Sequence, residues 1–527
     1  MKRIIKVSAI FVFLFFSGCS LKDLEKNADK EVYGIIEEKK IEISKELVPE
    51  ELVKLDDDSS GETIFVNMKD AIIFAVKNNR DYKSKQEDVY LNILNLTYQR
   101  YLFRTRYNIS GNVGWNKADD ETVSGSLGLN IFRWLATGAQ ITFDMTKDFL
   151  HYLTGDKSSD LPTIISLNLL QPLLKGAGRT IAQENLVQTE RDAIYSVRNF
   201  IRYQNSFSVD TTERYLSLLL KKNSAENIYN NYESLKATRE RVENLSEAGR
   251  LPPFQVDQAK QSEFAAYQNW VRANNSYITS LDSFKIFLGL PAESNLIMDG
   301  QLLEHLINVG IDKPEIKISE YLATTLQKRL DLLTYYDRVE DAKRGINIAL
   351  DELKPEVNVR LGVKSSLETK SFPDLDIKDP TYNTRITFNL PLNKLPERNK
   401  YKRALLDLNR KERDFESMRN NIILEVSQQY NNLEEFYQSY LIQLNSLNLA
   451  EKRIESTNLL LQAGRATTRD LLEAEESYLQ AKNALSSSVV NFLISHLKFL
   501  YATENLELDD TGLWKGDLYE KITKQNI

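Results

Sequence analysis

The chain has 527 residues, of which 42% are apolar and 27% are charged, and it contains only 20 Gly and 12 Pro. Length alone suggests about three or four globular domains, but this composition is more typical of long helices than of a loop-rich chain. The formal net charge of −7 gives no general attraction to nucleic acid, so no nucleic-acid partner is expected.

Residues 1–18 have the features of a lipoprotein signal peptide. Basic residues come first, at Lys2, Arg3 and Lys6, and the apolar run 7–16 follows. This run is too short to cross a bilayer as a helix, which needs about 20 residues. We therefore expect cleavage of the segment rather than its retention as an anchor.

Cys19 is the only cysteine, so no disulfide can form within the chain. It follows the small residues Ser17 and Gly18, and this arrangement resembles a bacterial lipobox, which implies cleavage before Cys19 and its acylation. Ser20, in place of Asp, favours the outer membrane by resemblance to lipoprotein sorting. The alternative is an ordinary signal peptide with an incidental cysteine.

Residues 19–61 are rich in Lys, Glu and Asp, and we interpret them as a tether between the lipid anchor and the first helix. Two repeats follow, at 62–313 and 314–505, because residues 248–287 match residues 463–502 at an offset of 215. Residues 506–527 form a C-terminal tail.

Each repeat is predicted to contain short strands followed by a helical hairpin. Apolar and polar residues alternate in the first repeat at 107–116, 123–131, 139–146 and about 163–170, within a strand region of about 107–172. The second repeat has the same alternation within about 355–392. Such strands have one apolar face and one polar face.

The predicted hairpins span 180–289 and 398–503. Residues 180–247 and 398–463 contain no proline, and each could extend about 100 Å as one helix. Apolar residues recur every seven positions in the second hairpin, first at Val426, Leu433, Tyr440, Leu447, Ile454 and Leu461, and then at Leu471, Tyr478, Leu485, Phe492 and Phe499. This spacing predicts coiled-coil packing.

Glycines mark the turns between the paired helices. Gly249 and Gly464 stand where a left-handed C-cap residue is needed, and the next helix then starts at Pro252-Pro253 or at Thr467. Thr467 and Asp470 have the spacing of a capping box. We therefore expect sharp, exposed hairpin tips.

Apolar-out and polar-in alternation is the pattern of a transmembrane β-barrel, in which no sheet edge can face lipid. Four to six strands cannot close a barrel of useful bore, so several copies must share it. A small soluble β-subdomain with one packed face would show the same alternation and is the alternative.

The chain resembles the TolC-like outer membrane efflux family from about residue 62 to 505. The resemblance is carried by residues 171–179 (QPLLKGAGR), 248–250 (AGR), 390–392 (LPL) and 463–474 (AGRATTRDLLEA). It implies a mainly α fold with β-strands, assembled as a homotrimer. The trimer would have a periplasmic α-barrel of twelve helices and a shared transmembrane β-barrel in the outer membrane lipid. This β-barrel would have twelve strands, four from each copy. The strands near 123–131 and 139–146 exceed that number, so either a hairpin folds outside the barrel or the strand count differs.

The resemblance also implies function and partners. It implies a passive exit duct of a tripartite efflux or type I secretion system, with a periplasmic adaptor (membrane fusion) protein and an inner-membrane pump. Asp470 and Glu473 match the acidic residues of the periplasmic aperture, whereas their first-half counterparts are Gln255 and Gln258. A helix cap and a solvated helix face are the alternative roles.

Arg250 and Arg465 lie at the hairpin tips, where family members contact the adaptor. Alternatively, each arginine neutralises the terminal carbonyls of the preceding helix.

The sequence contains no Gly-rich phosphate loop, paired-cysteine metal site or nucleophile elbow, and His151, His305 and His496 are scattered. We therefore expect neither an enzyme nor a bound metal or cofactor, and we expect His496 to be packed or at the surface. A periplasmic coiled-coil scaffold lipoprotein without a pore is the rival hypothesis, but it gives the alternating segments no purpose.

Overall fold

The computed structural model describes residues 28–37, 63–117, 121–152, 158–291, 293–371, 374–509 and 511–515. The predicted signal peptide, Cys19 and most of the predicted tether lie outside these residues. Within the described residues the chain divides into two compact units. Unit 1 contains 28–37, 88–198 and 334–416, and unit 2 contains 63–87, 199–333 and 417–515.

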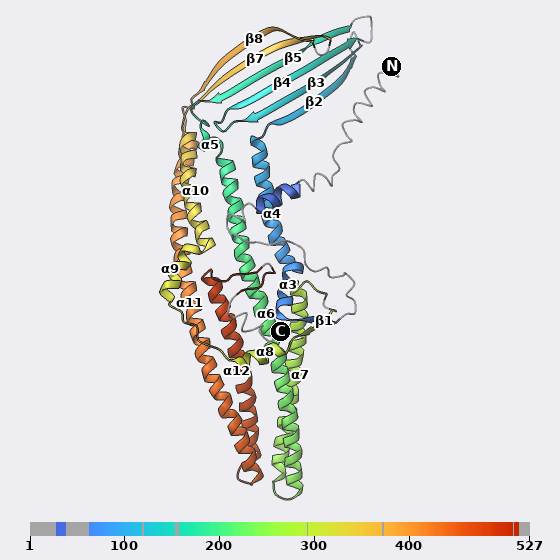
Figure 1. The fold of residues 1–527 in the computed structure, drawn as a ribbon, viewed down its shortest axis with the longest axis vertical. Coiled ribbons are helices and arrows are strands. Elements are labelled where there is room, and N and C mark those ends of the chain that lie inside the picture. The colour runs from blue at the N-terminus through green and yellow to red at the C-terminus, as the bar shows by residue number, and fades with distance from the viewer. Residues whose placement is uncertain are drawn as a thin grey trace. The chain divides into compact units, whose positions relative to one another are not determined.

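Unit 1 is built around one antiparallel sheet of six strands, which lie side by side in Figure 1. The strands are β2 (Arg106–Lys117), β3 (Glu121–Trp134), β4 (Gln140–Tyr152), β5 (Ser158–Pro172), β7 (Glu356–Ser371) and β8 (Asp374–Asn389). Their order in the sheet is also their order in the chain. Pairing of β5 with β7 joins the strands of the two predicted repeats.

The two additional strands of the first half belong to this sheet. They are β3 and β4, which lie between β2 and β5 and pair with neighbours on both sides. The hairpin that they form is therefore part of the sheet and does not fold away from it. The strand count differs from the four that the resemblance implies.

Long helices run through both units. They are α4 (Arg80–Phe103), α6 (Glu184–Glu247), α10 (Leu330–Glu352) and α11 (Leu395–Gln462), and the short α5 (Arg179–Ala182) precedes α6. The helix α6 begins at Glu184 rather than at 180 because Gln183 is the C-cap of α5. The helix α11 begins before the predicted 398, since Pro396 is tolerated in the first turn of a helix.

One part of the predicted tether is described, and residues 28–37 are helical. They pack on α4 in unit 1, where the Tyr90 hydroxyl donates to Asp29 at 2.5 Å. The Arg104 guanidinium lies 3.4 Å from the Glu31 carboxylate. This segment is therefore a packed helix.

In unit 2 the long helices form two hairpins with returning helices, α6 with α7 (Pro253–Phe287) and α11 with α12 (Thr468–Ala502). Most of the predicted heptad positions of the second hairpin are buried, at Val426, Leu433, Tyr440, Leu461, Leu471, Leu485, Phe492 and Phe499. The coiled-coil prediction is therefore confirmed. The His496 ring lies 6.1 Å from the Phe492 ring and is tilted by 55° against it. Burial lowers the pKa of the His496 imidazole.

Smaller elements complete unit 2. Two short strands, β1 (Thr63–Val66) and β6 (Asn295–Met298), pair in parallel, and the helices α3 (Met68–Asn78), α8 (Gln301–Val309) and α9 (Ile318–Lys328) connect the longer ones. Trp514, in the predicted tail, is 2% exposed, so this part of the tail is packed. Among the described helices, none is both long and apolar enough to span a membrane.

Candidate functional site

The two hairpin tips of unit 2 use the same turn. Gly249 and Gly464 have φ values of 71° and 65°, so both occupy the left-handed region as the sequence predicts. In each turn the following arginine N–H donates to a carbonyl of the last helical turn, Arg250 to Leu245 and Arg465 to Leu460, both at 2.8 Å. These are Schellman motifs, which satisfy carbonyl groups that the helix end leaves free.

The carboxylate of Asp470 closes the start of α12. It accepts hydrogen bonds from the Thr467 backbone N–H at 2.8 Å and from the Thr467 hydroxyl at 2.7 Å. The predicted capping box is therefore present. These hydrogen bonds from Thr467 hold the pKa of Asp470 below its usual range, so this exposed carboxyl is charged at neutral pH.

Glu473 lies one turn further along α12 and is paired with two arginines. Its carboxylate is 3.0 Å from the Arg469 guanidinium and 3.9 Å from that of Arg453, which comes from α11. All three side chains are at least half exposed. The negative charge of Glu473 is thus partly balanced within its own hairpin, whereas that of Asp470 is held by a helix cap.

Arg250 and Arg465 are exposed at the tips. Within the described residues, no ion pair is formed by either guanidinium. Each residue contributes to its turn through its backbone N–H, and its side chain is exposed to solvent.

Polar side chains join the two hairpins to each other. The Thr468 hydroxyl donates to Gln255 at 2.8 Å, and the Asn227 amide donates to Asn483 at 2.9 Å. The Ser234 hydroxyl donates to Glu475 at 2.7 Å. These contacts link α7 and α6 with α12.

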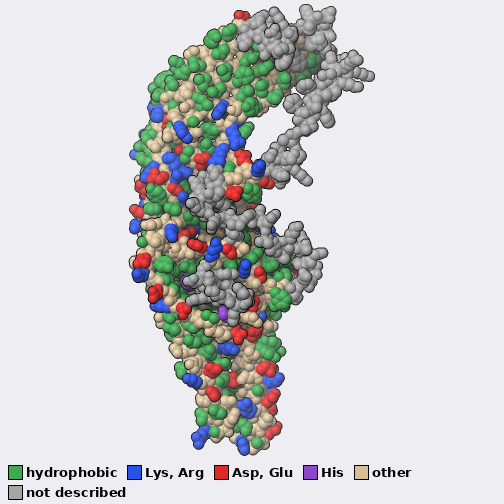
Figure 2. Space-filling view, viewed as in Figure 1, with side chains coloured by type: hydrophobic (Ala, Val, Ile, Leu, Met, Phe, Trp, Pro, Cys, Tyr) green, Lys and Arg blue, Asp and Glu red, His purple; other side chains and the backbone are tan. Residues whose placement is uncertain are grey.

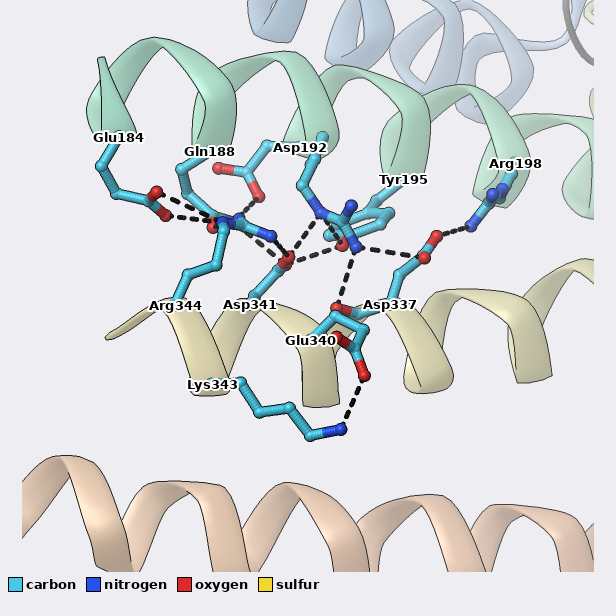
Figure 3. A network of polar contacts seen from close by, with 11 residues as sticks. Glu184, Gln188, Asp192, Tyr195, Arg198, Asp337, Glu340, Asp341, Lys343 and Arg344 are labelled. Atoms are coloured by element: carbon cyan, nitrogen blue, oxygen red, sulfur yellow. Dashed lines mark hydrogen bonds and ion pairs between the residues drawn. The ribbon is translucent and has the colours of Figure 1, made fainter. Parts of the chain in front are cut away.

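In unit 1 a polar network joins α6 to α10, and Figure 3 shows that its side chains point toward one another from the two helices. Asp337 accepts from the Arg198 guanidinium at 2.6 Å and also pairs with Arg191 at 3.1 Å. The Tyr195 hydroxyl donates to Asp341 at 2.7 Å. Burial, with this hydrogen bond, raises the pKa of Tyr195, so the phenol remains protonated and the network stays intact at neutral pH.

The two faces of the sheet differ in polarity across its full width. One face carries an apolar row with a residue from every strand: Tyr107, Ile131, Phe143, Leu167, Val363 and Tyr382. The adjacent row on the opposite face is polar throughout: Asn108, Asn130, Asp144, Ser166, Lys364 and Thr381. Figure 2 shows hydrophobic side chains gathered over the strands, whereas charged side chains gather over the helices.

Comparison with known proteins identifies this architecture. Residues 322–489 match the family described as outer membrane efflux protein. The Campylobacter jejuni CmeC outer membrane channel is similar with a TM-score of 0.60 at 13% identity, over 90% of this chain and 96% of that chain. The chain therefore has a TolC-like fold. This confirms the resemblance stated from the sequence motifs.

Other solved structures share the TolC-like fold. A membrane protein from Pseudomonas aeruginosa has a TM-score of 0.60 at 14% identity, over 83% of this chain and 92% of that chain. The open state of the Neisseria gonorrhoeae MtrE outer membrane channel has a TM-score of 0.56 at 13% identity, over 83% and 88%. No curated protein sequence matches the chain. At these identities the comparison establishes the fold.

Sequence reasoning missed one titratable residue between the hairpins of this TolC-like fold. The side chain of Glu475 is buried against α6, and burial raises the pKa of its carboxyl despite the hydrogen bond from Ser234. A signal was present, because Glu475 lies four residues after Leu471 and three before Tyr478 on the apolar stripe of α12. A charged residue on such a stripe needs a buried partner.

Sequence reasoning also missed two junctions at the ends of the returning helices. In the first junction, the Asn79 amide donates to the carbonyl of Phe287 at 2.8 Å. In the second, the Arg329 guanidinium donates to the carbonyl of Ala502 at 3.1 Å. Phe287 and Ala502 are related by the repeat offset of 215, so both hairpins are fixed at equivalent points.

The second junction is charged. Arg329 is 3% exposed and pairs with Asp331 at 3.0 Å and with Glu425 at 2.6 Å. Arg202 pairs with Glu504 and lies 3.4 Å from Asp331. Five ionisable groups from several helices therefore share one largely buried cluster.

Proposed function

We propose that this protein is the outer-membrane exit duct of a tripartite efflux or type I secretion system, and that it conducts substrates passively from the periplasm to the exterior. The observation that carries the proposal is the sheet with one apolar and one polar face, in the same chain as two long helical hairpins. A scaffold without a pore has no use for such a sheet. The outer membrane channels among the structural relatives support the same conclusion.

The proposed assembly is a homotrimer in the outer membrane. Three copies would place the apolar faces against lipid and the polar faces toward a lumen. Acylation of Cys19 would add a lipid anchor, in agreement with the lipobox-like sequence before it. A pump in the inner membrane would supply the energy.

Asp470 and Glu473 are the proposed aperture residues, and Asp470 is the stronger candidate. Its carboxylate is exposed and held in its charged form by Thr467, whereas two arginines balance Glu473. Three copies of Asp470 near one axis would repel one another and attract cations. Arg250 and Arg465 are the proposed adaptor contacts, because their guanidinium groups project from the tips.

Planar-bilayer recording tests the duct and its aperture together. The purified protein should conduct ions, and the double substitution Asp470→Ala with Glu473→Ala should raise the conductance. The control is Glu451→Ala with Glu455→Ala, which removes the same charge from exposed positions on α11. Equal conductance of the aperture variant and the wild type would reject the aperture assignment, and absence of any conductance would reject the duct.

Two biochemical tests address the membrane and the partners. Heat-modifiable migration and resistance to carbonate washing are expected of a shared barrel, whereas a peripheral scaffold would be released or held only by its acyl chains. Photo-cross-linkers placed at Arg250 and Arg465 should capture the adaptor in cells. Capture from positions along α11 instead of the tips would contradict the tip assignment.

A further inference from the structure

The hairpin of β3 and β4 is an integral part of the sheet. Its pairing with β2 runs without interruption from Arg106 opposite Phe132 to Lys117 opposite Glu121. On the other side, pairing of β4 with β5 is regular from Gln140 to Lys147 and has one irregularity beyond it. A hairpin folded away from the barrel would lack at least one of these ladders.

In the two rows described above, the side chains of this hairpin follow the same division of faces as the other strands. Ile131 and Phe143 continue the apolar row between Tyr107 and Leu167. On the opposite face, the Asn130 amide donates to Asp144 at 2.5 Å, and the Ser166 hydroxyl donates to the same carboxylate at 3.4 Å. Both β3 and β4 are therefore suited to lie between lipid and water, like their neighbours.

The two edge strands of the sheet could each pair with a strand from another copy. Within the described residues β2 and β8 each have one neighbouring strand, and both carry exposed apolar residues, Val113 and Trp115 on β2, and Tyr382 and Ile386 on β8. An unpaired edge in hydrocarbon is strongly unfavourable. Because the strand number is even, β8 of one copy runs antiparallel to β2 of the next.

We propose that β2 of one copy pairs with β8 of the next copy, and that three copies close an eighteen-stranded barrel. The inference rests on the trimeric duct proposed above and adds its strand number, its seam and its bore. Barrels of 16–18 strands leave an aqueous channel, whereas barrels of about eight strands are filled by side chains. The polar rows of this sheet would line that channel.

The extra hairpin changes the bore substantially. With strands about 4.8 Å apart and tilted by about 40°, eighteen strands give a backbone diameter of about 36 Å, compared with about 24 Å for twelve. Inward side chains reduce these values by about 10 Å, so the open bores are roughly 25 Å and 14 Å. The cross-section of the open bore is about three times larger with the hairpin.

Cysteine cross-linking of the full-length protein tests the seam. Asn112→Cys on β2 is combined in turn with Thr381→Cys, Asn383→Cys or Arg385→Cys on β8, because the register between copies is not fixed by one chain. We expect one combination to give disulfide-linked species of two and three copies, and none larger. The matched control is Asn112→Cys with Ile386→Cys, whose side chains lie on opposite faces and should not cross-link.

Polymer exclusion in planar bilayers tests the bore independently. A polymer of about 1 nm hydrodynamic radius should enter the wild-type barrel and lower its conductance when added to one side, because the open bore is roughly 25 Å. Deletion of residues 118–157 removes β3 and β4, leaves a three-residue loop, and keeps Tyr107 opposite Leu167. This variant should exclude the same polymer.

The outcomes separate the two proposals. Disulfide-linked species of two copies and none larger, or equal polymer exclusion by wild type and deletion variant, would overturn the eighteen-stranded barrel and leave the duct in place. Failure of the wild type to conduct and to oligomerise would overturn both proposals. If the deletion variant does not fold, the cross-linking result on the full-length protein decides.

Discussion

Replacement of Gly289 by alanine should destabilise the first junction more than its backbone conformation alone explains. Gly289 has a φ of 78°, and a Cβ there would lie 2.6 Å from the carbonyl oxygen of Asn78 and 2.9 Å from its carbonyl carbon. A left-handed alanine costs about 1–2 kcal/mol. The close backbone contact adds about 1–3 kcal/mol, because the junction between α3 and α4 must shift. We therefore expect a loss of about 2–5 kcal/mol.

Gly464→Ala is the matched control. Gly464 has a similar φ of 65°, but a Cβ there meets no atom within 4 Å, so only the conformational cost applies. The gain from a less flexible unfolded chain, about 0.4–1 kcal/mol, is common to both variants and cancels in the comparison. Their difference isolates the contact with Asn78.

Hydrogen exchange in detergent is the suitable assay, since it measures local opening without requiring reversible unfolding. Gly289→Ala should accelerate exchange at the end of α7 and at the start of α4 by about 5-fold or more, compared with the acceleration that Gly464→Ala causes at its own tip. Equal acceleration at the two sites would refute the steric reasoning.

Two further substitutions test the buried charges. Arg329→Met leaves the carboxylates of its cluster without their guanidinium and should lower the free energy of unfolding by about 3–5 kcal/mol, as measured by denaturant titration. The control is Lys317→Met, at a 77% exposed side chain, which should change stability by less than about 0.5 kcal/mol. Similar losses in the two variants would contradict a stabilising role of the buried Arg329. Burial raises the pKa of Glu475, so its ionisation costs stability as the pH rises above the unfolded value of about 4.3. Glu475→Gln should therefore raise the melting temperature at pH 7 and not at pH 4. Glu476→Gln, at an exposed position, should leave the melting temperature unchanged at either pH. An equal effect of Glu475→Gln at both pH values would exclude desolvation of the Glu475 carboxylate as the cause.

Local patterns predicted the elements of this fold well. The heptad of α11 correctly gave Val426, Leu433 and Tyr440 as buried, because a seven-residue period depends only on helix geometry. The left-handed Gly249 and Gly464 were predicted for the same reason, since each turn is determined within a few residues. Functional roles of the tip residues stay predictions.

These local patterns could not predict contacts between residues that are far apart in the sequence. Alternation in 123–131 and 139–146 predicted strands, but it carries no information about which strand lies beside which. The parallel pairing of Thr63–Val66 with Asn295–Met298 was missed because each strand is very short and its partner is far along the chain. Asn79 gave no signal either, since its amide bonds a carbonyl 208 residues away.

The two junctions show that the repeat conserves geometry while changing chemistry. Glu504 is the counterpart of Gly289 in the second repeat, at the offset of 215. It adopts the same left-handed conformation, with a φ of 55°, although it is not a glycine. This conformation costs a residue with a Cβ about 1–2 kcal/mol. The cost is tolerated because the Glu504 carboxylate pairs with Arg202 inside the charged cluster. The first junction needs only an amide and a glycine, whereas the second needs a set of charges, so damage to one charge there should weaken the anchoring of the hairpin that carries Asp470.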